Sequence, residues 1–329
     1  MPCRSEEDGS SRKRQFHSRT YAHEALAGID LHGKTMAITG TTSGIGVETA
    51  RSLLQNGAHI VMMNRNVAES EKQKDQFLSE FPNARIDVVP CDLNSLASVK
   101  KAGQIYLENG WPLHGLILNA GVLGPAIQKT SDGFESHFGV NHVAHFMLLQ
   151  TLLPVLRSSA PSRLVILTAV LSKYCSVKPE FPMETKLNIL CPKEADANYV
   201  RMYARSKMCN ILTAFKVHRD EYANGISTYA VHPGSGVRTD LGRHTRFGRV
   251  SNLLISPFTK NASQGAATSV YCVAHPEVRE ASGRYWESCW DDEKTLDKKV
   301  AKDEELQDAL WKKTEELLYE WEESNATRM

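Results

Sequence analysis

The chain has 329 residues, of which 41% are apolar, and a formal net charge of +1. This length allows one large or two ordinary domains with a full hydrophobic core. The near-neutral charge gives no reason to expect a nucleic-acid partner. The seven cysteines lack CxxC or metal-ligand spacing, so we expect reduced intracellular thiols and no metal site.

No segment of the sequence predicts secretion or a membrane span. Residues 1–20 are charged, rich in serine and without periodicity, which predicts a disordered tail and no secretory signal. The most apolar run, residues 146–156, is interrupted by Gln150 and Pro154 and falls short of the roughly 18 residues of a membrane span. We therefore expect a cytoplasmic protein that does not cross a membrane.

Strand-like and helix-like segments alternate from Lys34 onward. Short apolar runs predict strands at residues 34–39, 58–63, 84–90, 113–121, 162–169, 226–234 and 283–287. Helical patterns lie between them at residues 44–57, 66–80, from Asn94 onward and at 134–156. This alternation predicts an α/β fold: a Rossmann-like, doubly wound parallel sheet of about seven strands with helices on both faces, in a single domain over residues 21–290.

Two segments depart from the alternation. Residues 171–197 contain three prolines and no clear period, and their place before a helix predicts an insertion at the rim of a site. Residues 295–321 carry apolar residues such as Leu306 and Leu310 among many charges. We expect residues 291–329 to form an amphipathic C-terminal helix that packs on the domain or on a partner.

A glycine-rich turn, TGTTSGIG at residues 39–46, joins the first strand to the first helix. Such a turn lets backbone amides approach a pyrophosphate, and the helix N-terminus adds a favourable dipole. The alternative is a turn that needs glycine only for its backbone geometry. The predicted cofactor-binding residues of this turn are Gly40, Thr42, Ser43, Gly44, Ile45 and Gly46.

The end of the second strand decides between the two nicotinamide dinucleotides. An acidic residue there binds the ribose 2′-hydroxyl of NAD, whereas an arginine accommodates the 2′-phosphate of NADP. This chain has Asn64 followed by Arg65, which favours NADP(H), with NAD(H) as the alternative cofactor. Arg65 as an ordinary surface residue is the other interpretation.

Two further strand ends carry candidate cofactor contacts. Asp92, after the third strand, can accept the adenine amino group or can cap the helix that begins near Asn94. Asn119, Ala120 and Gly121 end the fourth strand, where small residues let the backbone lie against a cofactor. A simple strand-ending turn is the alternative for this tripeptide.

Tyr203 and Lys207 lie four residues apart in YARSK and therefore share a helix face. A nearby ammonium favours the phenolate and lowers the tyrosine pKa from about 10. Such a tyrosine can exchange a proton with an alcohol or a carbonyl. Taken singly, Tyr203 can be a core aromatic residue and Lys207 a solvated charge.

These motifs, in this order, resemble the short-chain dehydrogenase/reductase family over about residues 28–287. The matching motifs are TGTTSGIG, CDL at 91–93, NAG at 119–121, Asn141, YARSK, and HPG at 232–234. Within the family, TSDGFESHFGVNHVAHF and RSKMCNIL are similar to the branch of WW domain-containing oxidoreductases and retinol dehydrogenase-like reductases. The first tryptophan is Trp111, so we expect the catalytic domain without a WW module.

The resemblance implies the interconversion of a carbonyl and an alcohol with a nicotinamide cofactor. It implies that Tyr203 is the proton donor or acceptor, that Lys207 contacts the nicotinamide ribose, and that Asn141 holds a water for proton relay. It adds Leu93, beside Asp92, to the cofactor contacts. It also implies that Pro233, Gly234 and Thr239 lie at the nicotinamide carboxamide.

One position departs from the family pattern. The family has a serine at the end of the fifth strand that binds the reacting oxygen, and this chain has Ala169 there, after Thr168. Losing one hydrogen bond to a developing oxyanion costs about 10²–10³ in rate. Thr168 is the tentative substitute, although alternation along the strand turns it to the other side, and Ser172 is a more distant candidate. Three alternatives stay open. Another hydroxyl compensates for the missing serine, the enzyme is slow, or the protein binds a nucleotide without turnover.

The substrate and the oligomeric state follow only from the resemblance. The segment after HPG, which covers the substrate pocket in the family, carries the apolar residues Leu253, Leu254, Ile255 and Phe258. They suit a small apolar carbonyl or alcohol substrate such as a lipid, steroid or retinoid. Many members pair through helices equivalent to residues 134–157 and 199–223, so we expect a homodimer.

Overall fold

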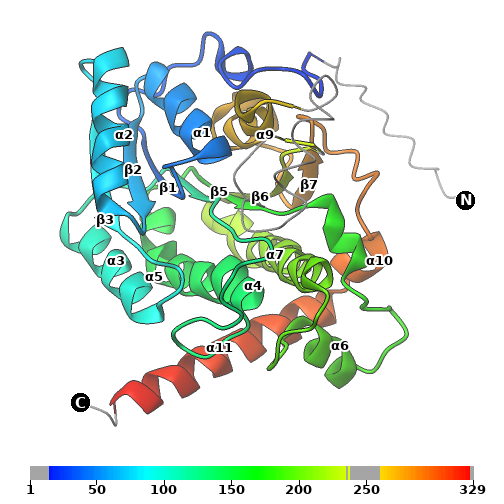
Figure 1. Cartoon of the computed structure of the whole chain (residues 1–329). Coiled ribbons are helices and arrows are strands. Elements are labelled where there is room, and N and C mark those ends of the chain that lie inside the picture. Colours follow the sequence, from blue (N-terminus) through cyan, green and yellow to red (C-terminus); the bar gives the residue numbers. More distant parts are fainter. Residues whose placement is uncertain (1–14, 235, 238–259, 327–329) are drawn as a thin grey trace, which may run out of the picture.

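Seven parallel strands form one sheet at the centre of the protein. The computed structural model describes residues 15–234, 236–237 and 260–326, and the strand order is β3-β2-β1-β4-β5-β6-β7 (Figure 1). The strands are β1 (Thr35–Thr39), β2 (His59–Asn64), β3 (Ile86–Pro90), β4 (Gly115–Leu118), β5 (Ser162–Leu167), β6 (Ile226–His232) and β7 (Arg284–Glu287). The predicted seven-stranded parallel sheet is confirmed.

Helices cover both faces of the sheet, as Figure 1 shows. One face carries α1 (Gly44–Gln55), α2 (Val67–Glu80) and α9 (Ala262–Ala274); the other carries α3 (Leu96–Glu108), α5 (Ala144–Ser158) and α7 (Tyr199–Glu221). Two hydrophobic cores result, one on each side. Strands buried on both faces explain why their sequences are continuous apolar runs and not alternating ones.

The strand order reverses between β1 and β4. β1 pairs with β2 on one side and with β4 on the other, and both pairings are parallel. At such a reversal, the loops after the two central strands diverge and leave a crevice at the carboxyl ends of the strands. The glycine-rich turn after β1 and the NAG tripeptide after β4 therefore meet at this crevice.

The long helix predicted from residue 134 is divided by a π-turn. It consists of α4 (Ser136–Phe138), the π-turn η2 (Gly139–Val143) and α5. By length and composition, Ser136–Ser158 could cross a membrane, but 78% of its most apolar window is buried inside the protein. Burial between the sheet and other helices accounts for its apolar sequence.

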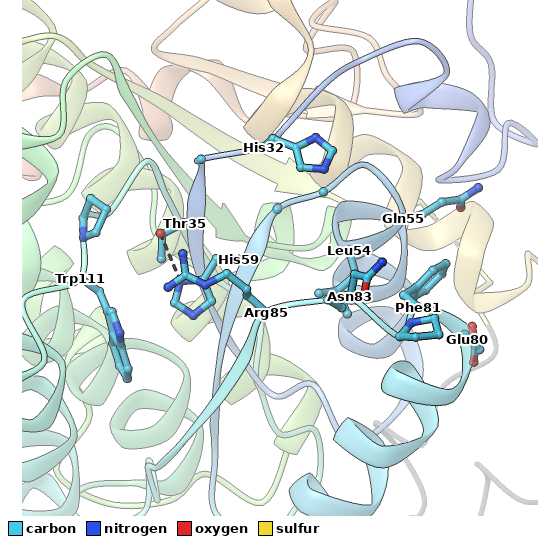
Figure 2. Close-up of a pocket in the computed structure, with 16 residues that line it drawn as sticks. His32, Thr35, Leu54, Gln55, His59, Glu80, Phe81, Asn83, Arg85 and Trp111 are labelled. Atoms are coloured by element: carbon cyan, nitrogen blue, oxygen red, sulfur yellow. Dashed lines mark hydrogen bonds between the residues drawn. The ribbon is translucent and has the colours of Figure 1, made fainter.

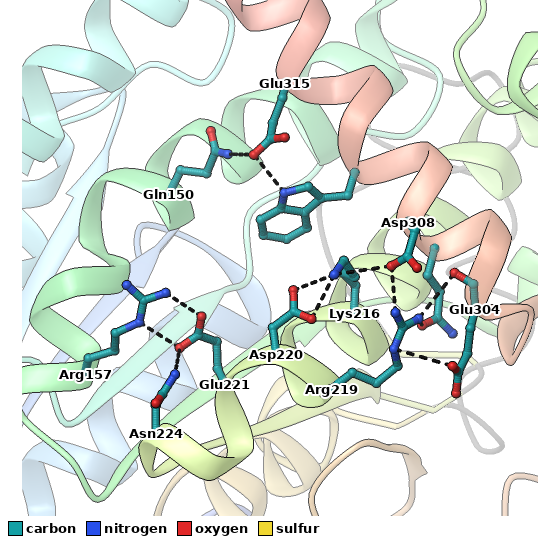
Figure 3. Close-up of polar contacts among 12 residues, drawn as sticks. Gln150, Arg157, Lys216, Arg219, Asp220, Glu221, Asn224, Glu304, Asp308 and Glu315 are labelled. Atoms are coloured by element: carbon teal, nitrogen blue, oxygen red, sulfur yellow. Dashed lines mark hydrogen bonds and ion pairs between the residues drawn. The ribbon is translucent and has the colours of Figure 1, made fainter.

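The C-terminal helix α11 (Glu304–Ala326) packs across α7 and α6 (Met183–Leu190), after the short helix α10 (Lys298–Ala301). Leu306, Leu310 and Leu318 on its inner face are buried. Polar pairs fix its position: Gln150 donates to Glu315 at 2.8 Å, and Arg219 donates to Asp308 at 2.7 Å (Figure 3). The expected amphipathic helix thus packs on the body of the protein.

This helix covers the surface through which a homodimer was expected. The rings of Phe146 in α5 and Trp311 in α11 meet edge to face with centroids 4.6 Å apart. His142, just before α5, bonds Thr314 of α11 at 3.1 Å. The chain's own helix therefore lies on part of this face, and the homodimer stays a prediction.

Several boundaries differ from the sequence-based expectation. Residues 15–20 belong to the folded body, because the Phe16 ring packs on Tyr271 with centroids 5.2 Å apart and its carbonyl accepts from Trp290. The aperiodic stretch 171–197 contains α6, preceded by a 3-10 turn, η3 (Val170–Tyr174). The sequence pattern does not predict helix α9, because this segment has mostly small residues and no clear amphipathic stripe.

Candidate active site

The glycine-rich turn after β1 is shaped for a close approach of backbone to a ligand. Gly40 and Gly44 have φ of 76° and 56°, a region that side chains disfavour. A Cβ on Gly46 would overlap the carbonyl oxygen of Gly40. Ser43 is the N-cap of α1, yet its side chain makes no capping hydrogen bond. The first N–H groups of α1 are therefore available to an anion, as a dinucleotide pyrophosphate requires.

Asn64 holds this turn and does not face the ribose end. Its Oδ1 accepts from the Thr41 N–H at 2.7 Å, and its Nδ2 donates to Thr41 Oγ1 at 2.8 Å and to Ser70 Oγ at 3.0 Å. The carboxamide is buried and fully bonded. Arg65 is exposed and bonds no described residue. Its side chain is therefore open to contact a substituent at the 2′ position of a cofactor ribose.

The NAG tripeptide lies against the glycine turn. Asn119 Nδ2 donates to the carbonyl of Thr39 at 2.8 Å and to that of Gly40 at 3.0 Å. A Cβ on Gly40 would stand 2.9 Å from the Ala120 Cβ. The small residues at these positions are required by the packing of the β1 and β4 ends, and this packing forms the floor of the crevice.

The same tripeptide connects the turn to the second motif. A Cβ on Gly121 would lie 3.5 Å from Lys207 Nζ and 3.1 Å from Asn141 Oδ1. Lys207 also donates to the carbonyl of Leu167, at the end of β5, at 3.0 Å. The lysine of YARSK and the glycine-rich turn thus meet at one edge of the sheet.

Tyr203 and Lys207 share a face of α7, as their spacing predicts. Lys207 Nζ stands 5.6 Å from the centroid of the Tyr203 ring, and both side chains are buried. Lys207 has one acceptor, the Leu167 carbonyl, among the described residues, so its other N–H groups are open to a ligand. The Tyr203 hydroxyl bonds no described residue.

The expectation that Lys207 lowers the tyrosine pKa does not hold for the chain without a cofactor. Burial raises the pKa of Tyr203 far above its usual value, and burial lowers the pKa of Lys207 to about 7. Desolvation penalises each charged form, and near neutral pH a half-deprotonated lysine exerts a weakened field on the phenol. A tuned tyrosine therefore needs a bound molecule that keeps Lys207 charged.

Asn141 is buried inside the π-turn, and both the nitrogen and the oxygen of its side chain are hydrogen-bonded. Its Oδ1 accepts from the Val122 N–H at 2.8 Å, and its Nδ2 donates to the Val122 carbonyl at 3.1 Å and to Ser206 Oγ at 3.0 Å. The carboxamide nitrogen therefore has no free N–H group, whereas Oδ1 keeps a second lone pair. The Asn141 backbone carbonyl accepts from His145 Nδ1 at 3.2 Å.

Thr168 does not fit the tentative role of the missing serine. Its Oγ1 donates to the Lys207 carbonyl at 2.9 Å, and its side chain is buried against α7. Ser172 is the other candidate, and a 3-10 turn brings its backbone N–H to the Ala169 carbonyl at 2.9 Å. Its side chain is buried, and its hydroxyl bonds no described residue.

The remaining predicted contacts are distributed around the same edge. Asp92 Oδ1 accepts from the Asn94 N–H at 3.0 Å, and the cap of α3 is Ser95 and not Asp92 or Asn94. Leu93 is buried, Thr42 and Ile45 lie in the turn and first helix, and Pro233 and Gly234 follow β6. Thr239 and the apolar residues 253–258 lie outside the described residues.

Sequence reasoning missed several polar side chains at this edge. Lys260 Nζ lies against Gly234 and donates to Ser288 Oγ at 3.2 Å. His137 packs edge-on to Tyr203 with centroids 6.3 Å apart, and its Nδ1 bonds the buried Glu135 at 2.6 Å. The sequence did carry a signal for some of these side chains, because histidines and a carboxylate occur within a segment that is otherwise apolar.

A separate cavity of about 490 Å³ lies at the opposite edge of the sheet (Figure 2). Thr35 and His59, at the amino ends of β1 and β2, line it together with Arg85 and Trp111. His59 is already satisfied, by Thr35 Oγ1 at 3.2 Å and Asp87 at 2.8 Å. Ligands of open α/β sheets bind at the carboxyl ends of the strands, so we assign this cavity no part in the site.

The fold and this edge define a nicotinamide-dependent oxidoreductase of the dinucleotide-binding α/β class. A family profile described as short chain dehydrogenase matches residues 34–178. The WW domain-containing oxidoreductase of Danio rerio is 36% identical over 314 residues, which cover 95% of this chain and 75% of that protein. The chain belongs to the short-chain dehydrogenase/reductase family.

Two further comparisons concern sequence and fold. Retinol dehydrogenase 14 of Mus musculus is 38% identical over 289 residues, which cover 83% of this chain and 84% of that protein. The crystal structure of L-sorbose reductase from Gluconobacter frateurii, complexed with NADPH and L-sorbose, has a TM-score of 0.60 at 16% identity. The superposition covers 78% of this chain and 95% of the sorbose reductase chain, which shows that the two share a fold.

The buried Lys207 predicts a pH dependence of stability in the cofactor-free protein. Its folded pKa of about 7 lies below its usual 10.5, so between these values the unfolded chain binds more protons. The free energy of unfolding of the wild type, relative to Lys207→Met, should therefore rise with pH across this window by at most about 1.4 kcal/mol per pH unit. Urea denaturation from pH 7 to 10 measures it, with exposed Lys312→Met as the control; a difference that stays flat would contradict the depressed pKa.

Proposed function

We propose that this protein is an NADP(H)-dependent oxidoreductase that interconverts a carbonyl and an alcohol on an apolar substrate, with Tyr203 as general acid and base. The observation that carries the proposal is a buried Lys207 beside Tyr203, at the strand edge that also holds an uncapped helix N-terminus and a glycine-rich turn. Structural roles alone do not account for a buried lysine whose one described acceptor is the Leu167 carbonyl, because burying an ionisable amine with few partners is costly.

The residues at the edge fit a dinucleotide. The N–H groups of α1 would bind its pyrophosphate, the Lys207 N–H groups would bind the nicotinamide ribose, and Pro233 and Gly234 would adjoin the carboxamide. Arg65 would pair with a 2′-phosphate, which supports NADP(H) over NAD(H). The dinucleotide, when bound, supplies or accepts the hydride.

The chain's own contribution is to orient the substrate and move a proton. Tyr203 would donate its proton to the substrate oxygen during reduction and take it back during oxidation. Dinucleotide hydroxyls that accept from Lys207 would favour its charged form, and that charge would lower the pKa of the neighbouring phenol. The Asn141 carbonyl would hold the water that returns the proton.

The apolar substrate class rests on two supports. The apolar residues Leu253, Leu254, Ile255 and Phe258 follow the HPG turn in the sequence. Two of the similar proteins are named retinol dehydrogenase 14 and 12, and retinol is an apolar alcohol. A lipid, steroid or retinoid would match both.

Ala169 favours a second candidate function, a nucleotide-binding sensor or interaction protein with weakened turnover. The residue is 7% exposed and offers no donor to a substrate oxygen. The unpartnered hydroxyl of Ser172, one 3-10 turn onward, supports the enzyme instead, because it can bind that oxygen. Absence of NADPH oxidation over a broad panel of ketones, aldehydes and retinoids, with intact NADPH binding, would select the sensor.

Removal of the phenolic hydroxyl tests the acid/base role. Tyr203→Phe should lower kcat by about 10²–10⁴-fold while the dissociation constant for NADPH stays nearly unchanged. The matched control is Tyr199→Phe, one helical turn earlier and 39% exposed, which should leave both values unchanged. Equal activity of the two variants would remove Tyr203 from the mechanism.

Paired substitutions test how the missing serine is compensated. Ser172→Ala should lower kcat by about 10²–10³-fold, the usual cost of one oxyanion donor, and Ala169→Ser in that background should restore it. Exposed Lys173→Ala controls for damage to the 3-10 turn. An unchanged kcat in Ser172→Ala would show that this hydroxyl does not contact the reacting oxygen.

A charge deletion tests the cofactor preference. Arg65→Ala should weaken NADPH binding by about ten- to hundredfold and leave NADH binding unchanged, because the guanidinium contacts only the 2′-phosphate. Arg85→Ala, an exposed arginine at the opposite edge of the sheet, is the control. Equal losses for both dinucleotides would reject the assigned role of Arg65, and a wild type that prefers NADH would reject the NADP(H) preference.

A further inference from the structure

Two histidines of the same helical region are buried in the core and have different partners. His142 and His145 are each 2% exposed. His142 bonds Thr314 of the C-terminal helix at 3.1 Å. His145 bonds Thr39, the last residue of β1, at 2.9 Å, and the Asn141 carbonyl at 3.2 Å. Only His145 therefore touches both the glycine-rich turn and the π-turn that holds Asn141.

The hydrogen bonds around Thr39 fix the tautomer of His145. Thr39 Oγ1 accepts from the N–H group of Ala120 at 3.1 Å and from that of Asn119 at 3.0 Å, which the Ile117 carbonyl shares. The Asn141 carbonyl can only accept, so His145 Nδ1 donates to it, and Nε2 of the neutral ring accepts from the Thr39 hydroxyl. A neutral imidazole with an accepting Nε2 carries its proton on Nδ1, where the Asn141 carbonyl receives it. Burial favours this neutral form by lowering the pKa of His145 to about 3.

Further donors lead toward the catalytic helix. Asn141 Nδ2 donates to Ser206 Oγ at 3.0 Å, and Ser206 Oγ donates to the Tyr203 carbonyl at 2.8 Å. Asn141 thus joins two sets of buried hydrogen bonds: its backbone carbonyl accepts from His145, and its side chain donates to Ser206.

We propose that His145 is a positioning residue that holds the dinucleotide turn and the Tyr203–Lys207 helix in one geometry through its two hydrogen bonds. The inference rests on the proposed use of this edge as a dinucleotide site. Without the imidazole, Thr39 Oγ1–H loses its acceptor, and the bonds from Asn119 and Ala120 that shape the turn are no longer fixed. The Asn141 carbonyl also loses its donor, which frees the π-turn beside Lys207.

The matched pair His145→Phe and His142→Phe separates positioning from packing. Both changes place a ring of similar volume in the same core, so both lower the melting temperature. The dissociation constant for NADPH should rise about tenfold or more in His145→Phe, the factor for one lost buried hydrogen bond, and stay within about twofold in His142→Phe. In an active enzyme, His145→Phe should also raise the KM for NADPH and lower kcat. Equal effects of the two variants on these constants would overturn the proposal.

Two further measurements keep the test decisive if His145→Phe does not fold. Thr39→Ser keeps the hydroxyl that donates to His145 and should bind NADPH like the wild type, whereas Thr39→Val should bind it more weakly. Nitrogen-15 NMR of the wild type should show His145 as a neutral Nδ1–H tautomer near neutral pH. An Nε2–H tautomer, or equal NADPH binding by the two Thr39 variants, would overturn the proposal. A wild type that binds neither NADPH nor NADH would instead reject the proposed function and leave the tautomer measurement valid.

Discussion

The hydroxyl of Thr39 is the point on which the geometry of the site depends. It accepts two backbone N–H groups from the end of β4 and donates to His145, so all its bonding capacity is used inside the protein. Because β1 ends at Thr39, these bonds decide where the glycine turn begins and how close β4 comes to it. Asn119 then closes the contact by donating to the carbonyls of Thr39 and Gly40.

Burial governs the ionisation of Tyr203 and Lys207 in the chain without a ligand. The Tyr203 phenol and the Lys207 amine are both removed from water, and each becomes harder to ionise. A dinucleotide would change this balance, since its hydroxyls would accept from the ammonium and replace the lost hydration. In the proposed mechanism, the acidity of the phenol would therefore depend on whether the dinucleotide is bound.

The C-terminal helix covers part of the surface that the family resemblance predicts to be a dimer interface. α11 buries Leu306, Leu310 and Leu318 against the face formed by α5, α6 and α7. It also reaches the π-turn through Thr314 and His142. The helix thus completes the core on the side of the sheet that carries Tyr203, and its apolar stripe has its partner within the same chain.

The sequence by itself determined the parallel sheet, the glycine turn and the spacing of Tyr203 and Lys207. These features depend on local periodicity and on residues close together in the chain. Only the tertiary structure decided that Thr168 bonds the Lys207 carbonyl, that Asn64 supports Thr41, and that His145 meets Thr39. It also decided the direction of the Tyr203 pKa shift, because desolvation depends on everything packed around a group. Partners that lie 23 to 106 residues apart leave no periodic signal in one sequence, since they are brought together only by the packing of strands and helices.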